Sequence, residues 1–114
     1  MNARSIDVSI VILSWNTRDL TRACLLALNA AAAASALVIE TIVIDNASED
    51  DSVAMILGEF PEVRLYRNAA NVGYARGVNQ GLELYRGRMV MLLGSDTEVR
   101  PGTIDAMVQF LESH

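Results

Sequence analysis

Lysine is absent from this chain, and all nine basic residues are arginine. This absence excludes Walker-type phosphate loops, Schiff-base chemistry and any mechanism that uses a lysine as the base. Fourteen acidic residues give a formal net charge of −5. Because nucleic-acid surfaces need a clustered basic footprint, we expect no nucleic-acid partner. Phosphate recognition would have to use arginine, backbone amides or a metal ion.

Cysteine and aromatic residues are also scarce. The single cysteine, Cys24, excludes an internal disulfide and is typical of a reducing compartment. Aromatic residues make up 5% of the chain, whereas hydrophobic residues make up 52%. Such an aliphatic, alanine-rich composition favours helices packed on a sheet over a β-sandwich. The length of 114 residues predicts one domain, 1–114, with a single core.

Long hydrophobic runs are missing as well. The longest uncharged stretch, residues 23–39, is diluted by Asn29 and by alanines, so no transmembrane segment is predicted. The amino end, residues 1–7, is short and polar and does not resemble a signal peptide. We therefore expect a cytoplasmic location, at the inner membrane face in the full-length protein.

Four short apolar runs are typical of strands that are covered on both faces. They are residues 8–13, 41–44, 63–66 and 89–93. Between and after them, apolar residues recur with the period of a helix. The four predicted inward faces are Leu20, Cys24, Ala27 and Leu28; Val53, Ile56, Leu57 and Phe60; Ala75, Val78, Leu82 and Tyr85; and Ile104, Met107, Val108 and Leu111. The βαβαβαβα order predicts an α/β fold, a Rossmann-like three-layer sandwich with a mostly parallel sheet.

Helix boundaries can be predicted from local signals. Ser48 with Asp51 resembles a capping box, Pro61 should end the second helix, and Gly87 should follow the third. Pro101 suits the first position of the last helix. The alanine run 30–34 is interpreted as a helix end followed by a loop.

Polar residues follow three of the predicted strands, and the carboxyl ends of parallel strands share one rim of the sheet. The clusters are Ser14-Trp15-Asn16, Asp45-Asn46-Ala47-Ser48 and Ser95-Asp96-Thr97. The first turn lacks a G-x-G-x-x-G motif, so a dinucleotide site is not expected. Asp45 either closes an Asx-turn or accepts a hydrogen bond from a ligand, and both interpretations stay open. Asp96, opposite the loop of the first strand, is the leading functional residue.

Residues 71–81 place three glycines in a predicted helix, where each glycine costs about 1 kcal/mol relative to alanine. Close packing of the helix on the sheet would explain Gly77 and Gly81. Gly73 and Arg76, near the amino end of the helix, are better placed to meet a phosphate or a base. For Trp15, packing on the first helix is favoured over closing the site above a ligand.

Taken together, four stretches resemble the inverting family 2 glycosyltransferases, and most of all their rhamnosyltransferase-like branch. The stretches are residues 8–16, 43–48, 71–81 and 92–97. This resemblance implies the amino-terminal, donor-binding half of a GT-A fold, with strand order 3-2-1-4. It implies that Ser14, Asn16 and Asp45 surround the nucleoside of a UDP-, dTDP- or GDP-sugar, and that Asn71, Gly73 and Arg76 border the same pocket. Asp96, with Ser95 beside it, matches the last carboxylate of the DxD motif, which holds Mg²⁺ or Mn²⁺ against the donor diphosphate.

The chain departs from the family pattern in two ways. Gly94 replaces the first acid of the DxD motif, so metal binding rests on one carboxylate with diphosphate oxygens and water. The family places the acceptor site and the catalytic base beyond the strand that carries DxD, whereas this chain stops at His114. We therefore expect donor binding without sugar transfer by the chain alone. We also expect the exposed edge of strand 89–93 to allow a homodimer.

Two alternatives to a working donor site stay open: a non-catalytic relic that retains the nucleotide-binding fold, and a doubly wound interaction domain. A receiver-like domain is disfavoured because it needs a lysine and an acidic pair after the first strand, where this chain has residues 14–16. Nucleotide binding would separate a working donor site from a relic.

Overall fold

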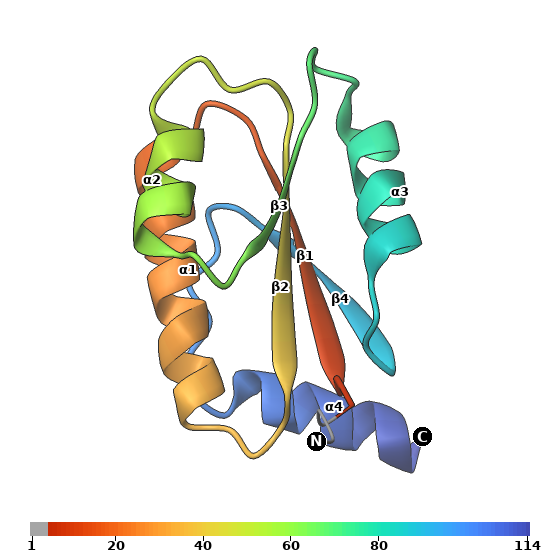
Figure 1. Ribbon diagram of the computed structural model, residues 1–114. Coiled ribbons are helices and arrows are strands. Elements are labelled where there is room, and N and C mark those ends of the chain that lie inside the picture. Colours follow the sequence, from red (N-terminus) through yellow and green to blue (C-terminus); the bar gives the residue numbers. More distant parts are fainter. Residues whose placement is uncertain (1–4) are drawn as a thin grey trace.

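The computed structural model describes residues 5–114 and contains alternating strands and helices (Figure 1). The elements are β1 (Val8–Ser14), α1 (Arg18–Ala33), β2 (Ile39–Asp45), α2 (Ser52–Glu59), β3 (Arg64–Arg67), α3 (Tyr74–Leu84), β4 (Met89–Gly94) and α4 (Thr103–Ser113). All four apolar runs form strands, with ends that differ from the predicted ends by one or two residues. The predicted α/β fold is therefore confirmed.

The four strands form one parallel sheet in the order β3-β2-β1-β4. This order confirms the expected 3-2-1-4 topology. β1 lies between β2 and β4, and its last residue, Ser14, is paired with Asp45 of β2. Because all strands run in the same direction, the loops after β1, β2 and β4 leave the sheet at the same end.

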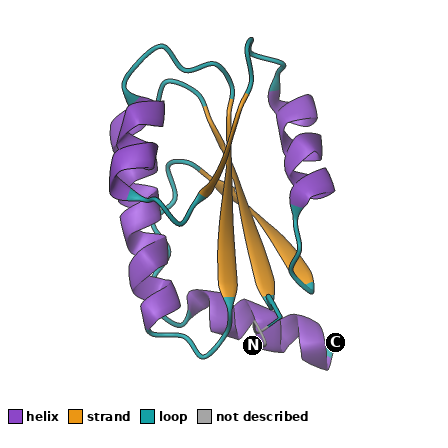
Figure 2. Cartoon of the chain, viewed as in Figure 1, coloured by secondary structure: helices purple, strands orange, loops and turns teal. Residues whose placement is uncertain are grey.

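The helices form layers on both faces of the sheet (Figure 2). α1 and α2 cover one face and α3 covers the other, while α4 lies across the end where the strands begin (Figure 1). The larger core lies on the α1 side and includes Ile10, Leu25 and Ile56, and the smaller core on the α3 side is centred on Val11 and Ile42. The end of the sheet where the strands finish is thus left to loops.

The predicted inward face of α3 is wrong. Leu82 and Tyr85 are 38% and 40% exposed, and the buried residues of α3 are Gly77 and Gly81. A Cβ atom on Gly81 would lie 2.3 Å from Cγ1 of Val11, and one on Gly77 would lie 2.4 Å from Leu13 Cδ1. The helix lies so close to the sheet that a larger residue at either position would displace a side chain of β1, which confirms the close-packing interpretation of these two glycines.

The other three helical faces are partly wrong, because in each one some of the predicted inward side chains are exposed. Leu20, Leu57, Met107 and Leu111 are 52%, 59%, 46% and 57% exposed. The side chains that are buried instead or in addition are Thr21, Leu25 and Ala31 in α1 and Ser52 and Met55 in α2. Cys24 and Leu28 belong to both the predicted and the observed face of α1, so the two faces differ by less than one residue position. Two of the added inward residues, Thr21 in α1 and Ser52 in α2, are polar.

The helix ends confirm three predictions and contradict two. α2 ends at Glu59 before Pro61, and Gly87 follows α3. The capping box is wrong because the Ser48 hydroxyl donates to Asp45, and the Ser52 amide at the start of α2 donates to Asp50 Oδ1 (3.0 Å). Pro101 lies in a turn, since α4 begins at Thr103 after Gly102, which has a φ of 90°. The alanine run 30–34 contains the helix end as predicted, since α1 ends at Ala33 and Ala34 is its C-cap residue.

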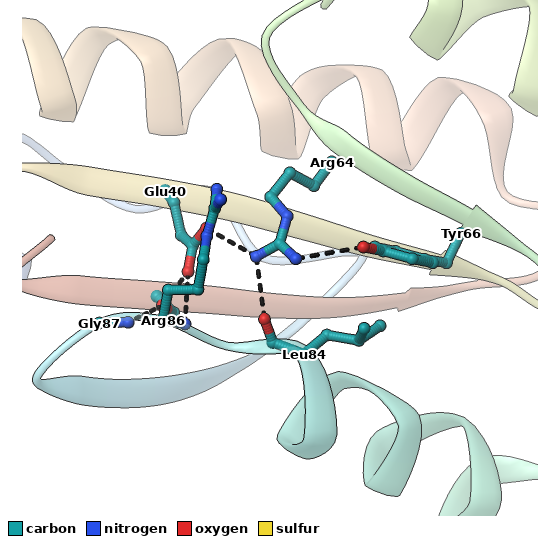
Figure 3. A network of polar contacts seen from close by, with 7 residues as sticks. Glu40, Arg64, Tyr66, Leu84, Arg86 and Gly87 are labelled. Atoms are coloured by element: carbon teal, nitrogen blue, oxygen red, sulfur yellow. Dashed lines mark hydrogen bonds and ion pairs between the residues drawn. The ribbon is translucent and has the colours of Figure 1, made fainter.

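A buried carboxylate that the sequence analysis did not identify anchors the α3–β4 connection (Figure 3). Glu40 of β2 accepts hydrogen bonds from the Ser9 hydroxyl (2.5 Å), the Arg86 amide (2.8 Å) and the Arg64 guanidinium (2.9 Å). Burial alone would raise the pKa of Glu40, but these hydrogen bonds, with those of the Arg86 side chain, outweigh it and lower the pKa to about 2. Gly87 donates to the same Ser9 hydroxyl (2.8 Å), so β4 is held at its start.

Within residues 5–114, none of the helices combines the length and the hydrophobicity needed to cross a lipid bilayer.

Candidate functional site at the carboxyl ends of the strands

The rim where the strands end collects the loops after β1, β2 and β4 together with the loop that leads into α3. A chain of hydroxyl groups crosses this rim from the core to the surface. Ser14 Oγ lies 3.1 Å from Thr21 Oγ1, which lies 3.0 Å from Thr17 Oγ1, which in turn lies 3.3 Å from Ser95 Oγ. Two predicted site residues, Ser14 and Ser95, lie at the two ends of this row of hydroxyl groups.

Thr17 and Thr21 were missed by the sequence analysis. Their signal was a pair of threonines four residues apart at the start of the first helix, which places both on one side of α1.

Asp45 forms a tight turn at the end of β2. It is 1% exposed, and its carboxylate accepts hydrogen bonds from the amide (2.9 Å) and the hydroxyl (2.7 Å) of Ser48. Between them Ala47 adopts a left-handed φ of 65°, which is costly for a residue with a side chain. Of the two interpretations left open, the local turn closed by the carboxylate describes this geometry, although the bonded amide lies three residues on, at Ser48, and not two as in an Asx-turn.

Asn16 joins the same turn from the β1 loop. Its amide donates to Ser48 Oγ (2.9 Å), and its side-chain oxygen accepts from the Glu49 amide (2.7 Å). Asn16 also has a left-handed φ, of 52°, which asparagine tolerates better than most residues. Ser48, which was not singled out as a site residue, therefore connects the two predicted residues Asn16 and Asp45.

The loop into α3 carries Asn71 and Gly73, and Arg76 lies in the first turn of the helix; all three residues are exposed. The Gly73 amide donates to Asn71 Oδ1 (2.8 Å), and Gly73 has a φ of 86°, which explains the glycine at the start of the helix. This loop is attached to the end of β2 by Asn46, which the sequence analysis named in a polar cluster but did not predict as a site residue. The Asn46 side chain donates to the Gly73 carbonyl (3.1 Å) and accepts from the Val72 amide (3.0 Å).

Asp96 is exposed in the turn that follows β4. A Cβ atom on residue 94 would lie 2.8 Å from Asp96 Oδ1, so Gly94 leaves room for this carboxylate to fold back over the strand end. In residues 5–114, no three histidine, cysteine or acidic side chains are grouped so that they could hold a metal ion. Asp96 therefore fits a cation such as Mg²⁺ or Mn²⁺ only if phosphate oxygens and water complete the coordination.

Two further residues were assigned to packing. Trp15 is 53% exposed, so the predicted packing on α1 is wrong and the indole lies at the rim surface. Cys24 is fully buried as predicted, and burial, with smaller contributions from Asp96 and Glu98, raises the pKa of its thiol to about 11. Such a thiol is protonated at neutral pH and is not a nucleophile.

A parallel sheet of order 3-2-1-4 with helices on both faces is the GT-A type of α/β fold, and solved structures agree. The chain superimposes on residues 1–349 of TarS from S. aureus with a TM-score of 0.80 at 18% identity, covering 96% of this chain and 33% of TarS. The TarS complex with UDP-GlcNAc gives a TM-score of 0.81, also at 18% identity, with coverage of 96% and 32%.

The sequence comparison then identifies the family. The chain belongs to glycosyl transferase family 2, whose model matches residues 9–114. It is 31% identical over 104 residues to the succinoglycan biosynthesis protein ExoO of Rhizobium meliloti (strain 1021). The aligned region covers 90% of this chain and 29% of ExoO. The chain thus spans about a third or less of the length of these relatives.

Proposed function

We propose that this chain is the donor-binding half of an inverting glycosyltransferase and that it binds a nucleotide-diphospho-sugar at the rim described above. The observation that carries the proposal is the meeting of four loops from separate parts of the sequence at one rim. Hydrogen bonds join Asn16 to Asp45 through Ser48, and Ser14 to Ser95 through two threonines. TarS has been crystallised with UDP and with UDP-GlcNAc, which supports the same class of donor here.

The residues have separate roles in this proposal. Ser14, Asn16 and Asp45 border the nucleoside, and Asn71, Gly73 and Arg76 line the side of the pocket formed by α3. Because Asp45 is 1% exposed and bonded to Ser48, a direct hydrogen bond from a base or ribose requires the turn to open. Before it opens, Asp45 shapes the pocket through Ser48 and Asn16.

Asp96, with Ser95 beside it, faces the diphosphate in this proposal and would hold Mg²⁺ or Mn²⁺. When bound, the cation supplies positive charge to the leaving diphosphate. The chain itself contributes one carboxylate, the Ser95 hydroxyl and the exposed Arg76 guanidinium, which is suited to pairing with phosphate oxygens. Because a single protein carboxylate makes a weak cation site, metal and nucleotide should bind together.

Titration calorimetry tests the proposal directly. UDP, dTDP and GDP are each titrated into the chain with and without Mn²⁺, and the titrations are repeated with Asp96→Ala. The matched control is Glu83→Ala, which removes an exposed carboxylate near the other end of α3. We expect one nucleotide to bind with Mn²⁺, the metal-dependent part of the affinity to disappear in Asp96→Ala, and Glu83→Ala to bind normally. The failure of all three nucleotides to bind would favour the relic or the interaction domain.

We propose sugar transfer only for a longer protein that contains this chain. The 114 residues cover about a third or less of the length of their relatives, and we expect them to show no turnover alone. Measurable transfer by the purified chain would contradict this expectation. The rhamnosyltransferase-like branch and the cytoplasmic location likewise stay predictions, and a preference for dTDP in the titration would support the former.

A second copy of the chain is proposed as a partner at the edge of the sheet. Among residues 5–114, β4 pairs with β1 alone and lies at the edge of the sheet, and Leu92 on this strand is 47% exposed. Unpaired apolar edges favour pairing with another strand, and a charged side chain on the edge opposes it. Sedimentation equilibrium should show a dimer that Leu92→Lys dissociates. A chain that stays monomeric at high concentration would count against this partner.

A further inference from the structure

We infer that Asn46 is a positioning residue, which fixes the loop 68–73 and the first turn of α3 in the geometry that binds the donor nucleotide. This inference rests on the proposed function and adds to it a residue whose own side chain is buried. Asn46 is 2% exposed, so it acts through the loop that it holds.

The side chain of Asn46 joins three parts of one loop. Its oxygen accepts from the Val72 amide (3.0 Å) and from Asn68 Nδ2 (3.1 Å), and its nitrogen donates to the Gly73 carbonyl (3.1 Å). Its backbone amide donates to the Ser14 carbonyl (2.8 Å). Both lone pairs of the oxygen are used, so a single buried amide ties the ends of β1 and β2 to a loop more than twenty residues away.

The start of the same loop is held to α3. Asn68 and Gln80 exchange two side-chain hydrogen bonds of 2.8 and 2.9 Å, and the Asn68 amide donates to the Asp45 carbonyl (2.9 Å). The loop is therefore fixed at its first residue by α3 and β2, and at Val72 and Gly73 by Asn46. These contacts therefore also determine where the exposed residues Asn71 and Arg76 lie.

The contact with Gly73 sets the start of α3. The Gly73 carbonyl accepts from Asn46 and also from the Gly77 amide (3.2 Å), which is the first hydrogen bond of the helix. Arg76 lies in this first turn. If the Gly73 carbonyl moves, the first turn of α3 and the Arg76 side chain move with it, whereas the two buried glycines keep the rest of α3 on the sheet.

Only an amide satisfies all of these partners. An aspartate in its place would keep the size but would have no proton to donate, and a carboxylate oxygen would face the Gly73 carbonyl oxygen at about hydrogen-bond distance. Asn46→Asp should therefore push Gly73 away while leaving the core unchanged. Ile56→Val serves as the control, because it removes one methylene from the core on the α1 side and lowers stability without touching the loop.

The experiment compares the unchanged chain, Asn46→Asp and Ile56→Val at a temperature where circular dichroism shows all three to be folded. Hydrogen exchange reports the amides of residues 72–77, and titration calorimetry reports the affinity for whichever of UDP, dTDP and GDP the unchanged chain binds with Mn²⁺. We expect Asn46→Asp to accelerate exchange at these amides and to weaken binding by about tenfold, the order of loss that a small misplacement of binding groups produces. Ile56→Val should bind as the unchanged chain does.

Gln80→Ala provides a second variant at a half-buried position, in case Asn46→Asp does not fold. It releases Asn68 and should weaken binding in the same direction by a smaller factor. If the folded Asn46→Asp chain binds nucleotide normally, the inference is overturned while the proposed function stands. If Asn46→Asp does not fold, normal binding by Gln80→Ala has the same meaning. An equal loss of binding in Ile56→Val would overturn it too, because the effect would then follow stability. No binding by the unchanged chain would overturn the proposed function and this inference together.

Discussion

Replacing Glu40 by glutamine tests the electrostatic account of the α3–β4 anchor. The substitution keeps the shape of the side chain and removes its charge. In the folded chain this carboxylate is 9% exposed and accepts hydrogen bonds from Ser9, Arg64 and Arg86, including the 2.9 Å contact with the Arg64 guanidinium. Charged hydrogen-bond donors on a buried acceptor make the ionised form much more favourable in the folded state than in the unfolded state.

The magnitude follows from the pKa of Glu40, which falls from an ordinary value of 4.5 to about 2. A fall of this size corresponds to about 3 kcal/mol of folding free energy. Because the folded-state pKa is lowered, this stability is fully present above the unfolded value of 4.5 and is lost as the pH falls toward 2. Glu40→Gln should therefore lower the free energy of unfolding by about 3 kcal/mol at pH 7 and by roughly half as much at pH 3.

Urea unfolding followed by circular dichroism, at pH 7 and at pH 3, measures both values. Glu83→Gln is the control, since it removes the charge of an exposed glutamate on α3, and it should change stability by less than about 0.5 kcal/mol at either pH. A loss in Glu40→Gln that is equal at the two pH values would refute the reasoning, because it would show that the charge is not what stabilises the anchor.

Three further substitutions test backbone and packing. Gly81→Ala should destabilise the chain by about 1–3 kcal/mol in urea unfolding, because the new Cβ would lie 2.3 Å from the stiff side chain of Val11. Gly58→Ala, which meets nothing within 4 Å, should instead stabilise α2 by up to about 1 kcal/mol, and a loss would contradict the helix-propensity argument. Ala47→Gly should raise the melting temperature, with a gain of about 0.5 kcal/mol, since glycine adopts the observed φ of 65° without strain.

The strands could be predicted because β-branched and aliphatic runs have few other uses in a short chain, whereas their order in the sheet was implied by the resemblance to family 2 glycosyltransferases. The faces of the helices were harder. In α3 the apolar period selected Leu82 and Tyr85, whereas the sheet is contacted by Leu84 and by two buried glycines, which carry no hydrophobic signal of their own. In α1 the buried Thr21 belongs to a polar chain, so a count of apolar residues overlooks it.

In the candidate site, too, some residues could be predicted from the sequence and others could not. Residues at strand ends, such as Asp45 and Asp96, are found from their place after an apolar run. Asn46 could not be recognised, because its partners lie 22 to 27 residues further along the chain and the spacing reflects only the length of α2 and β3. Glu40 was missed for the same reason, since Arg64 and Arg86 become its neighbours only when the sheet has formed.

The hydroxyl chain from Ser14 to Ser95 can reverse its polarity. In each of its three links either oxygen can be the donor, so the protons can all point toward Ser95 or all point away from it. In the first arrangement Ser95 offers its proton to the solvent side, and in the second it offers a lone pair. The rim can thus present a donor or an acceptor at the same place through rotation of four hydroxyl groups, while every heavy atom stays where it is.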